Sequence, residues 1–286
     1  MYNLAIALGG SIVLFVAGWA LDGWVAGIVP ALLALIGVYI YLARRTGKQV
    51  EAIFLRAMAS LQAGDVDTGR AAFLEALPLG KWQFLVAEQV HGQIGQLIYQ
   101  QACGNLIEHK YTRDAAKKAL GEEKLREALA ELALAWSRDW RSQMVRALCL
   151  HRLNRFDELL PVMDKAEGGG ASEPLYWGMW AWMLNDQKKR DEALQIVGRG
   201  LAANAGSKSL LAVQEAFTNK RRPDMTVFGE QWYALMPDEI PKERLMEMAQ
   251  AQQGKAGGPV AANQPMPQSR EQRRAASQKT WPQPRR

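Results

Sequence analysis

Two long stretches without a charged residue open the chain, and they constrain its fold more than any other feature. The first runs from residue 4 to residue 21 and the second from residue 24 to residue 43, with Asp22 and Gly23 between them. Each stretch is close to the roughly 20 residues that a helix needs to cross about 30 Å of hydrocarbon. The sequence therefore predicts a transmembrane helical hairpin over residues 1–43.

Aromatic and basic residues flank the two stretches as they do at membrane interfaces. Trp19 and Trp24 stand on both sides of the turn. Tyr2, Tyr39 and Tyr41 stand near the opposite ends of the two stretches, and Arg44, Arg45 and Lys48 follow the second stretch. Because basic residues concentrate on the cytoplasmic side, we expect an integral protein of the inner or plasma membrane with its repeat domain in the cytoplasm. A cleaved signal peptide fits less well, because no Lys or Arg precedes the first stretch.

Small residues recur along the second stretch at intervals of four. Gly23, Gly27 and Ala31 would form one ridge of a helix, along which the first helix could approach closely. The ordinary abundance of glycine in membrane helices explains the same residues equally well. Pro30 leaves another alternative open, a hairpin that enters one leaflet without crossing the bilayer.

Helical periodicity and internal repeats replace the apolar pattern after Lys48. One copy has a Gly64-Asp65 turn, with a small residue before it and small or apolar residues after it: Ala57, then Gly69, Phe73, Ala76 and Leu77. A fuller copy lies further along the chain. Its first helix carries Trp177, Trp180, Ala181 and Leu184, and its second carries Ala193, Leu194, Val197, Gly200 and Leu201.

Two further copies lie between these. One has its turn at Asn154-Arg155, which is 34 residues before the turn at Lys188-Lys189. The other is divided, with about twenty residues around 107–121 inserted at its turn; its helices carry Ile94, Gly95 and Ile98, then Ala128, Leu132 and Ala135. These residue types and spacings resemble the tetratricopeptide repeat (TPR) family, although the proline that usually closes each repeat is missing.

The resemblance implies an all-α chain in which a TPR-like α-solenoid follows the hairpin over residues 44–222. In such a stack, small residues on one helix let its partner approach, and each pair buries its remaining apolar face against the next pair. The resemblance also implies a concave groove that holds peptides or other proteins. We expect Gly168-Gly169-Gly170 to be a flexible linker before a helix that Ser172 caps and Pro174 begins.

The residues after the repeats divide into a capping region, 223–253, and a tail, 254–286. Helices are expected at 207–219, 226–236 and 241–252, with Trp232 and Tyr233 sealing the end of the stack. The tail is rich in Gly, Pro, Gln and Ala and is expected to be disordered. Residues 249–286 hold seven basic residues and one acidic residue, and therefore carry the whole net charge of +6.

No arrangement typical of an enzyme or a metal site is found in the sequence. The three histidines and the two cysteines, Cys103 and Cys149, are not spaced as metal ligands. The sequence contains neither the nucleophile-elbow motif nor a phosphate-binding loop. We therefore expect no catalytic residue, no bound metal and no cofactor, and we expect that the protein is not an enzyme.

Two groups of residues are candidates for partner binding. Trp182 falls off the packing face of its helix and could anchor a protein partner in the groove, with Tyr176 near it. In the tail, basic residues and one tryptophan could bind anionic lipid, RNA or nothing, with RNA the less favoured because one aromatic gives little stacking surface: Arg270, Arg273, Arg274, Lys279, Trp281, Arg285 and Arg286.

The predicted function is a membrane-anchored scaffold or adaptor, held by residues 4–43, that binds protein partners at the cytoplasmic face of a membrane. A bacterial inner membrane is favoured. The alternative is a regulatory or enzymatic subunit of a membrane complex, or a lipid-binding or RNA-binding protein that acts through its tail.

Overall fold

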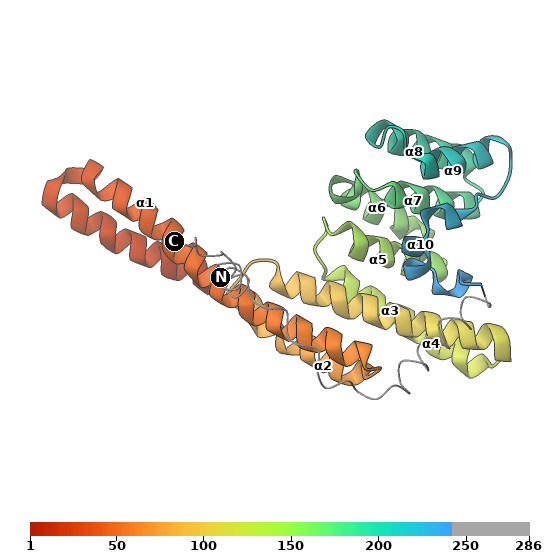
Figure 1. The fold of residues 1–286 in the computed structure, drawn as a ribbon, viewed down its shortest axis with the longest axis horizontal. Coiled ribbons are helices and arrows are strands. Elements are labelled where there is room, and N and C mark those ends of the chain that lie inside the picture. The colour runs from red at the N-terminus through yellow and green to blue at the C-terminus, as the bar shows by residue number, and fades with distance from the viewer. Residues whose placement is uncertain (242–286) are drawn as a thin grey trace, which may run out of the picture. The chain divides into compact units, whose positions relative to one another are not determined.

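The computed structural model describes residues 1–241, and this part of the chain is all-α, without a β-strand (Figure 1). An apolar hairpin comes first, and pairs of antiparallel helices follow it. The all-α fold predicted from the sequence is therefore confirmed. The expected helix at 241–252 and the expected disordered tail lie outside the described residues.

The hairpin is formed by helix α1 (Tyr2–Gln62), which reverses direction at Gly23. Gly23 has φ +83°, a backbone conformation that glycine adopts without strain. The arms run side by side: Asn3 Nδ2 donates to Thr46 Oγ1 over 3.1 Å, and Ser11 Oγ donates to the Ala31 carbonyl over 2.8 Å. The predicted reversal at residues 22 and 23 is confirmed.

Small residues let the two arms approach closely. A Cβ added to Gly18 would lie 2.6 Å from the Gly27 Cα, and one added to Gly27 would lie 2.5 Å from the Phe15 carbonyl oxygen. Ala31 is also buried between the arms. Gly27 and Ala31 of the predicted ridge thus lie in the contact, whereas Gly23 does not, because it makes the exposed turn.

The second arm does not end at residue 43, where the sequence suggested a domain boundary. It continues as one helix to Gln62 and there becomes the first helix of the first repeat pair, with α2 (Val66–Glu75) as its partner. Gly64, at φ +85°, makes the turn, and the Asp65 carboxylate caps α2 by accepting from the Thr68 N–H over 3.0 Å. No flexible linker separates the apolar arm from the repeats.

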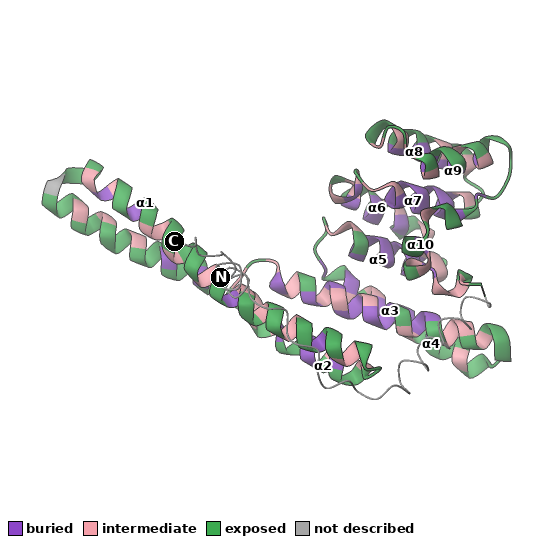
Figure 2. Cartoon of the chain, viewed as in Figure 1, coloured by how far each residue is buried: buried purple, intermediate pink, exposed green. Residues whose placement is uncertain are grey.

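Three more antiparallel pairs follow, and a single helix packs on the last of them. The short helix η1 (Leu77–Lys81) leads into the pairs α3 (Val86–Thr112) with α4 (Ala115–Ala133), α5 (Trp140–Arg152) with α6 (Phe156–Gly170), and α7 (Pro174–Asp186) with α8 (Arg190–Ala203), and then into α9 (Lys208–Thr218). Figure 2 shows buried residues concentrated in these pairs and exposed residues along the hairpin. The core runs through the whole stack.

The extra residues of the divided repeat, expected as an insertion at its turn, are helical. They lengthen both helices, so that α3 and α4 meet at a tight turn at Arg113-Asp114. The Asp114 carboxylate caps α4 by accepting from the Ala116 N–H over 2.9 Å. Gly121 allows the extension, because a Cβ there would lie 2.8 Å from the Leu106 side chain.

The three glycines expected as a linker are helical. They form the last turn of α6, where Gly170 packs against the Tyr176 ring and Gly169 against the Arg138 carbonyl. Pro174 begins α7 as predicted, but the N-cap residue is Glu173 and not Ser172.

The chain after α9 differs from the expected capping region. Residues 226–236 are not one helix, because Gly229, at φ +62°, separates the short helix η2 (Met225–Phe228) from α10 (Glu230–Leu235); η3 (Pro237–Glu239) follows. These elements do not extend the stack beyond α9. Instead, η2 packs on α9, and the chain then turns back to contact residues of α3, α5 and α7.

Candidate functional site

The candidate site is the side of the stack formed by the first helices of three successive pairs, α3, α5 and α7, which we name the first-helix face. Residues 225–239 lie against this face, and we name them the covering segment. Trp182, the residue expected to anchor a partner, lies on this face. Here the chain itself occupies it.

Aromatic side chains join the covering segment to α7. The Trp182 and Trp232 rings meet edge to face with centroids 5.5 Å apart, an arrangement that favours aromatic pairs. Trp182 is 6% exposed and Trp232 is 0% exposed. Gly178 on α7 leaves room for the Phe228 ring, which a Cβ at that position would strike. Trp232 and Phe228 of the covering segment therefore both pack against α7.

A hydrogen bond joins the segment to α3. The hydroxyl of Tyr99 donates to the Leu235 carbonyl over 2.7 Å. Burial raises the pKa of Tyr99 well above its ordinary value, so the phenol stays protonated and keeps its donor. The bond satisfies a polar group that would otherwise be buried without a partner.

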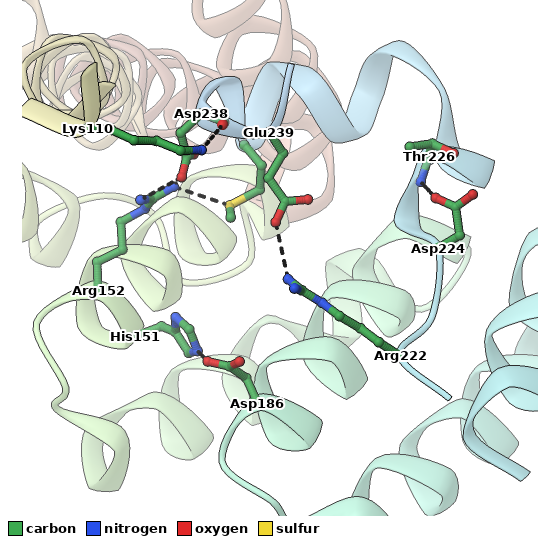
Figure 3. Close-up of polar contacts among 10 residues, drawn as sticks. Lys110, His151, Arg152, Asp186, Arg222, Asp224, Thr226, Asp238 and Glu239 are labelled. Atoms are coloured by element: carbon green, nitrogen blue, oxygen red, sulfur yellow. Dashed lines mark hydrogen bonds and ion pairs between the residues drawn. The ribbon is translucent and has the colours of Figure 1, made fainter. Parts of the chain in front are cut away.

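An ion pair joins the segment to α5 (Figure 3). Arg152 donates from Nη2 to Asp238 Oδ1 over 2.5 Å and from Nη1 to Asp238 Oδ2 over 3.3 Å. The side chains are 14% and 23% exposed, so the pair is far less screened than a surface pair. Lys110 and Arg222 make longer contacts with the Asp238 carbonyl and the Glu239 carboxylate, each 3.4 Å. The end of the segment is thus held by positive charge.

His151 lies on the same face, next to Trp182. Their ring centroids are 5.2 Å apart, and His151 Nε2 is 3.0 Å from Asp186 Oδ2 (Figure 3). Burial lowers the pKa of His151, and the Asp186 carboxylate opposes this only in part. A neutral imidazole is therefore favoured in the folded protein.

A cavity of about 260 Å³ opens beside Trp182, and its rim is basic. Arg190 comes from the start of α8, and Lys220, Arg221 and Arg222 come from the turn after α9. Asp186 is the acidic residue of the rim. A ligand group that enters this cavity would contact the Trp182 indole and would be surrounded by more basic than acidic side chains.

The two predicted anchor residues take different positions. Trp182 faces the side expected for a partner, but Trp232 covers it. Tyr176 is 0% exposed: its hydroxyl donates to the Met163 carbonyl, and its ring contacts Trp177 and Trp180, so it lies in the core between α6 and α7. The seven predicted lipid-binding residues of the tail lie outside the described residues.

Sequence reasoning placed Trp232 at the end of the stack, which is wrong. The residue instead fills the first-helix face, because the chain turns back after α9. The signals for this were Pro223, before the segment, and Gly229 and Pro237, which divide it into pieces too short to stack as a further pair.

Clusters of metal-ligating side chains and reactive thiols are scarce in residues 1–241. No group of three or more His, Cys, Asp or Glu side chains in this part of the chain is arranged to hold a metal ion. Cys103 and Cys149 are both buried and free, and burial raises the pKa of both thiols. The described site is therefore built for packing and ion pairing.

The fold and the site define an all-α protein in which an exposed apolar hairpin continues into stacked helix pairs. Comparison of the chain with protein-family models, curated proteins and solved structures found no match.

Proposed function

We propose that this protein is a membrane-anchored, TPR-like scaffold that binds protein partners at the cytoplasmic face of an inner or plasma membrane and catalyses no reaction itself. The observation that carries the proposal is the unbroken helix from Gly23 to Gln62. It joins an apolar arm directly to the first pair of the stack, so the stack is attached to the anchor without a linker.

The surface of the hairpin supports membrane insertion. Its two arms have apolar windows of mean hydropathy 2.2 and 2.3, of which only 6% and 11% are buried. A core helix of a water-soluble protein would be mostly buried. Large side chains such as Leu21, Val13 and Leu33 are instead 87%, 67% and 67% exposed. Lipid is the solvent that accepts such a surface without cost.

Contacts of the first arm support its retention in the mature protein. Asn3 is hydrogen-bonded to Thr46, and the Tyr2 ring lies 5.1 Å from the Trp82 ring. Removal of the first arm as a signal peptide would take away both contacts and uncover Thr46, which is buried in the hairpin. The hairpin is thus built into the fold of the residues that follow it.

Packing of the pairs supports the TPR-like assignment. Residues that carried the resemblance in α7 and α8 are buried: Trp177, Trp180, Ala181, Ala193, Val197 and Gly200. A Cβ on Gly200 would lie 2.6 Å from Trp177. This is the small-against-large packing that the repeat pattern implies.

The covering segment determines how a partner could bind. A partner that takes the place of Trp232 against Trp182 must displace the covering segment, which the Arg152–Asp238 pair holds in place. The indole Nε1 of Trp232 is buried and makes no hydrogen bond to another described residue, so the segment leaves one polar group unsatisfied. The basic rim beside Trp182 favours a partner that carries acidic residues next to an apolar anchor.

Site-specific photo-crosslinking in cells tests the scaffold proposal. A photoreactive amino acid at Asn185, on the rim of the Trp182 cavity, is placed in the full-length chain and in two variants, Asp238→Asn and Glu239→Gln. We expect a discrete protein adduct that Asp238→Asn strengthens, because it weakens the covering segment. Glu239→Gln is the matched control, because its partner Arg222 is 71% exposed and the contact is long.

The outcomes separate the possibilities. An adduct that is equally strong in all three chains places the partner outside the covered face. If no protein adduct forms from Asn185 or from a second position on the outer helix α8, the scaffold proposal loses its main support.

Cysteine labelling tests the orientation of the hairpin. A membrane-impermeant maleimide should label Leu21→Cys from outside intact cells, and should label Lys220→Cys only after lysis. The native thiols give no background, because Cys103 and Cys149 are each 0% exposed. Labelling of position 220 in intact cells would reverse the proposed orientation.

A further inference from the structure

The loop between the first two helix pairs lies at the open end of the hairpin. The Tyr2 and Trp82 rings meet edge to face with centroids 5.1 Å apart, and η1 contacts α1. Leu79 and Trp82 also line a cavity of about 300 Å³ together with Asn3 and Thr46. Residues 77–85, which we name the η1 loop, are therefore held beside the first residues of the first arm.

This open end is the level at which the apolar surface of the hairpin stops. Asn3 and Thr46 pair across the two arms there, and Arg44 and Arg45 are the first charged residues after the uncharged stretch. In a membrane protein this level corresponds to the headgroup region, where Trp and Tyr are enriched and where Lys and Arg reach the phosphates.

The η1 loop exposes apolar side chains at this level. Trp82 is 41% exposed and Phe84 is 56% exposed. Leu85 has φ +67°, an uncommon conformation for a residue with a branched side chain, so the loop has a defined shape where it enters α3. Lys81 is exposed next to Trp82. An aromatic pair beside a lysine is the composition of an interfacial anchor.

A half-exposed tryptophan alone would be ordinary for a surface loop. Two features favour a contact of this loop with the membrane. The exposed rings continue the aromatic set of Tyr2, Tyr39 and Tyr41, although they come from a segment about 40 residues further along the chain than the end of the second stretch. The basic residues around them also match the negative charge of the cytoplasmic leaflet.

We propose that the η1 loop is a second membrane contact, in which Trp82 and Phe84 insert into the headgroup region of the leaflet at the open end of the hairpin. The inference rests on the proposed membrane insertion of the hairpin. It adds a contact on the first repeat pair itself, so that the stack is held to the bilayer surface at a point outside the hairpin.

The experiment uses the full chain reconstituted in vesicles of phosphatidylcholine and phosphatidylglycerol. An environment-sensitive fluorophore is attached to a single introduced cysteine at Phe84, Leu55 or Leu33, and quenching by lipids with a nitroxide near the headgroup or deep in the acyl chain is measured. Leu55 is the matched control: it is 65% exposed and lies nine residues beyond Thr46, about 14 Å further along the same helix. Leu33 reports insertion of the hairpin.

We expect the probe at position 84 to be blue-shifted and quenched by the headgroup nitroxide, the probe at 33 to be quenched by the deep nitroxide, and the probe at 55 to be quenched by neither. Addition of Trp82→Ala should reduce quenching at 84. Equal behaviour of positions 84 and 55, with position 33 still quenched, would overturn the η1 loop contact and leave the anchored scaffold intact. Absence of quenching at 33 would overturn both.

Discussion

The hairpin exposes its tryptophan side chains, whereas the helix pair α7 and α8 buries them between its two helices. In the hairpin, Trp19 and Trp24 are 60% and 64% exposed, and small residues fill the space between the arms. In the pair α7 and α8, Trp177 and Trp180 are 1% and 2% exposed and stack on each other with centroids 6.1 Å apart. Both regions use glycine for close approach of two helices. They differ in where the large side chains lie: on the exposed surface in the hairpin and between the helices in the pair.

The difference teaches what each region must provide for itself. A helix pair in water has to bury its large apolar side chains against its own neighbours, so the stack gains stability from transfer and from packing. Helices in lipid gain little from burial of apolar area, and their association depends on close packing of small residues. A substitution of one kind should therefore have unequal effects in the two regions.

Removal of a core tryptophan should give the largest effect. Trp177→Ala leaves a cavity among Trp180, Tyr176 and Gly200 and should lower the free energy of unfolding by about 3–5 kcal/mol. The matched change Trp24→Ala removes the same side chain from the hairpin turn and should leave unfolding of the stack unchanged. Urea titration of both proteins in a mild detergent, followed by circular dichroism, measures this. Equal losses would mean that the two regions do not differ as described.

Two glycines of α8 give a smaller and more selective test. A Cβ on Gly200 would lie 2.6 Å from the Trp177 side chain, whereas Gly198 has nothing within 4 Å of such an atom. Gly200→Ala should therefore destabilise the stack, by about 1–3 kcal/mol. Gly198→Ala should stabilise it by up to about 1 kcal/mol, because alanine favours the helix. The same titration decides the sign of each change, and a loss at both positions would contradict the assigned packing.

The hairpin has an equivalent pair of glycines, whose substitution should alter the contact between the arms but not the stability of the stack. Gly27 faces Phe15 and Gly18, while Gly37 has open space around it. Gly27→Leu should lower the yield of a disulfide between Asn3→Cys and Thr46→Cys several-fold, because the arms can no longer approach. Gly37→Leu is the control. An unchanged yield in both would show that small residues do not set this contact.

The sequence predicted the elements better than their connections. Helix pairing followed from local signals: the Gly64-Asp65 turn, the 34-residue interval between two turns, and the small residues opposite Trp177. The boundary at residue 43 was marked by a change in polarity, but a change of solvent along a helix requires no break in it. The helix therefore runs on to Gln62.

The candidate site was predicted only in part. Trp182 lies off the contact between α7 and α8, as its position in the repeat predicted, but Trp232 packs on it, and its role in partner binding stays a prediction. What covers it could not be read from the sequence, because the contacts of Tyr99 with Leu235 and of Arg152 with Asp238 join residues 136 and 86 positions apart. Contacts this distant leave no periodicity in the sequence. Tyr176 looked similar to Trp182, but it lies six residues earlier on the helix, on a different face, and its side chain points into the core.

Protonation of His151 should give the smallest effect, and it connects the stack to the covering segment. Burial lowers the pKa of His151 from its ordinary value of 6.5, with Asp186 opposing the shift and Arg152 adding to it. Between the folded-state pKa and 6.5 the unfolded chain therefore binds a proton that the folded chain does not. Stability is fully present above this window and falls as the pH falls through it.

The measurement is the free energy of unfolding between about pH 7.5 and about pH 5, a range in which carboxylates stay ionised. In His151→Gln the free energy of unfolding should fall less over this range than in the native chain. In the control His109→Gln, at the turn between α3 and α4, it should fall as much as in the native chain. Because the His151 ring lies 5.2 Å from that of Trp182, the charged imidazole should also weaken the contact between Trp182 and Trp232. The crosslink from Asn185 should then strengthen at lower pH in the native chain and not in His151→Gln. A pH dependence that survives in His151→Gln would assign the effect to other groups and separate the histidine from the covering segment.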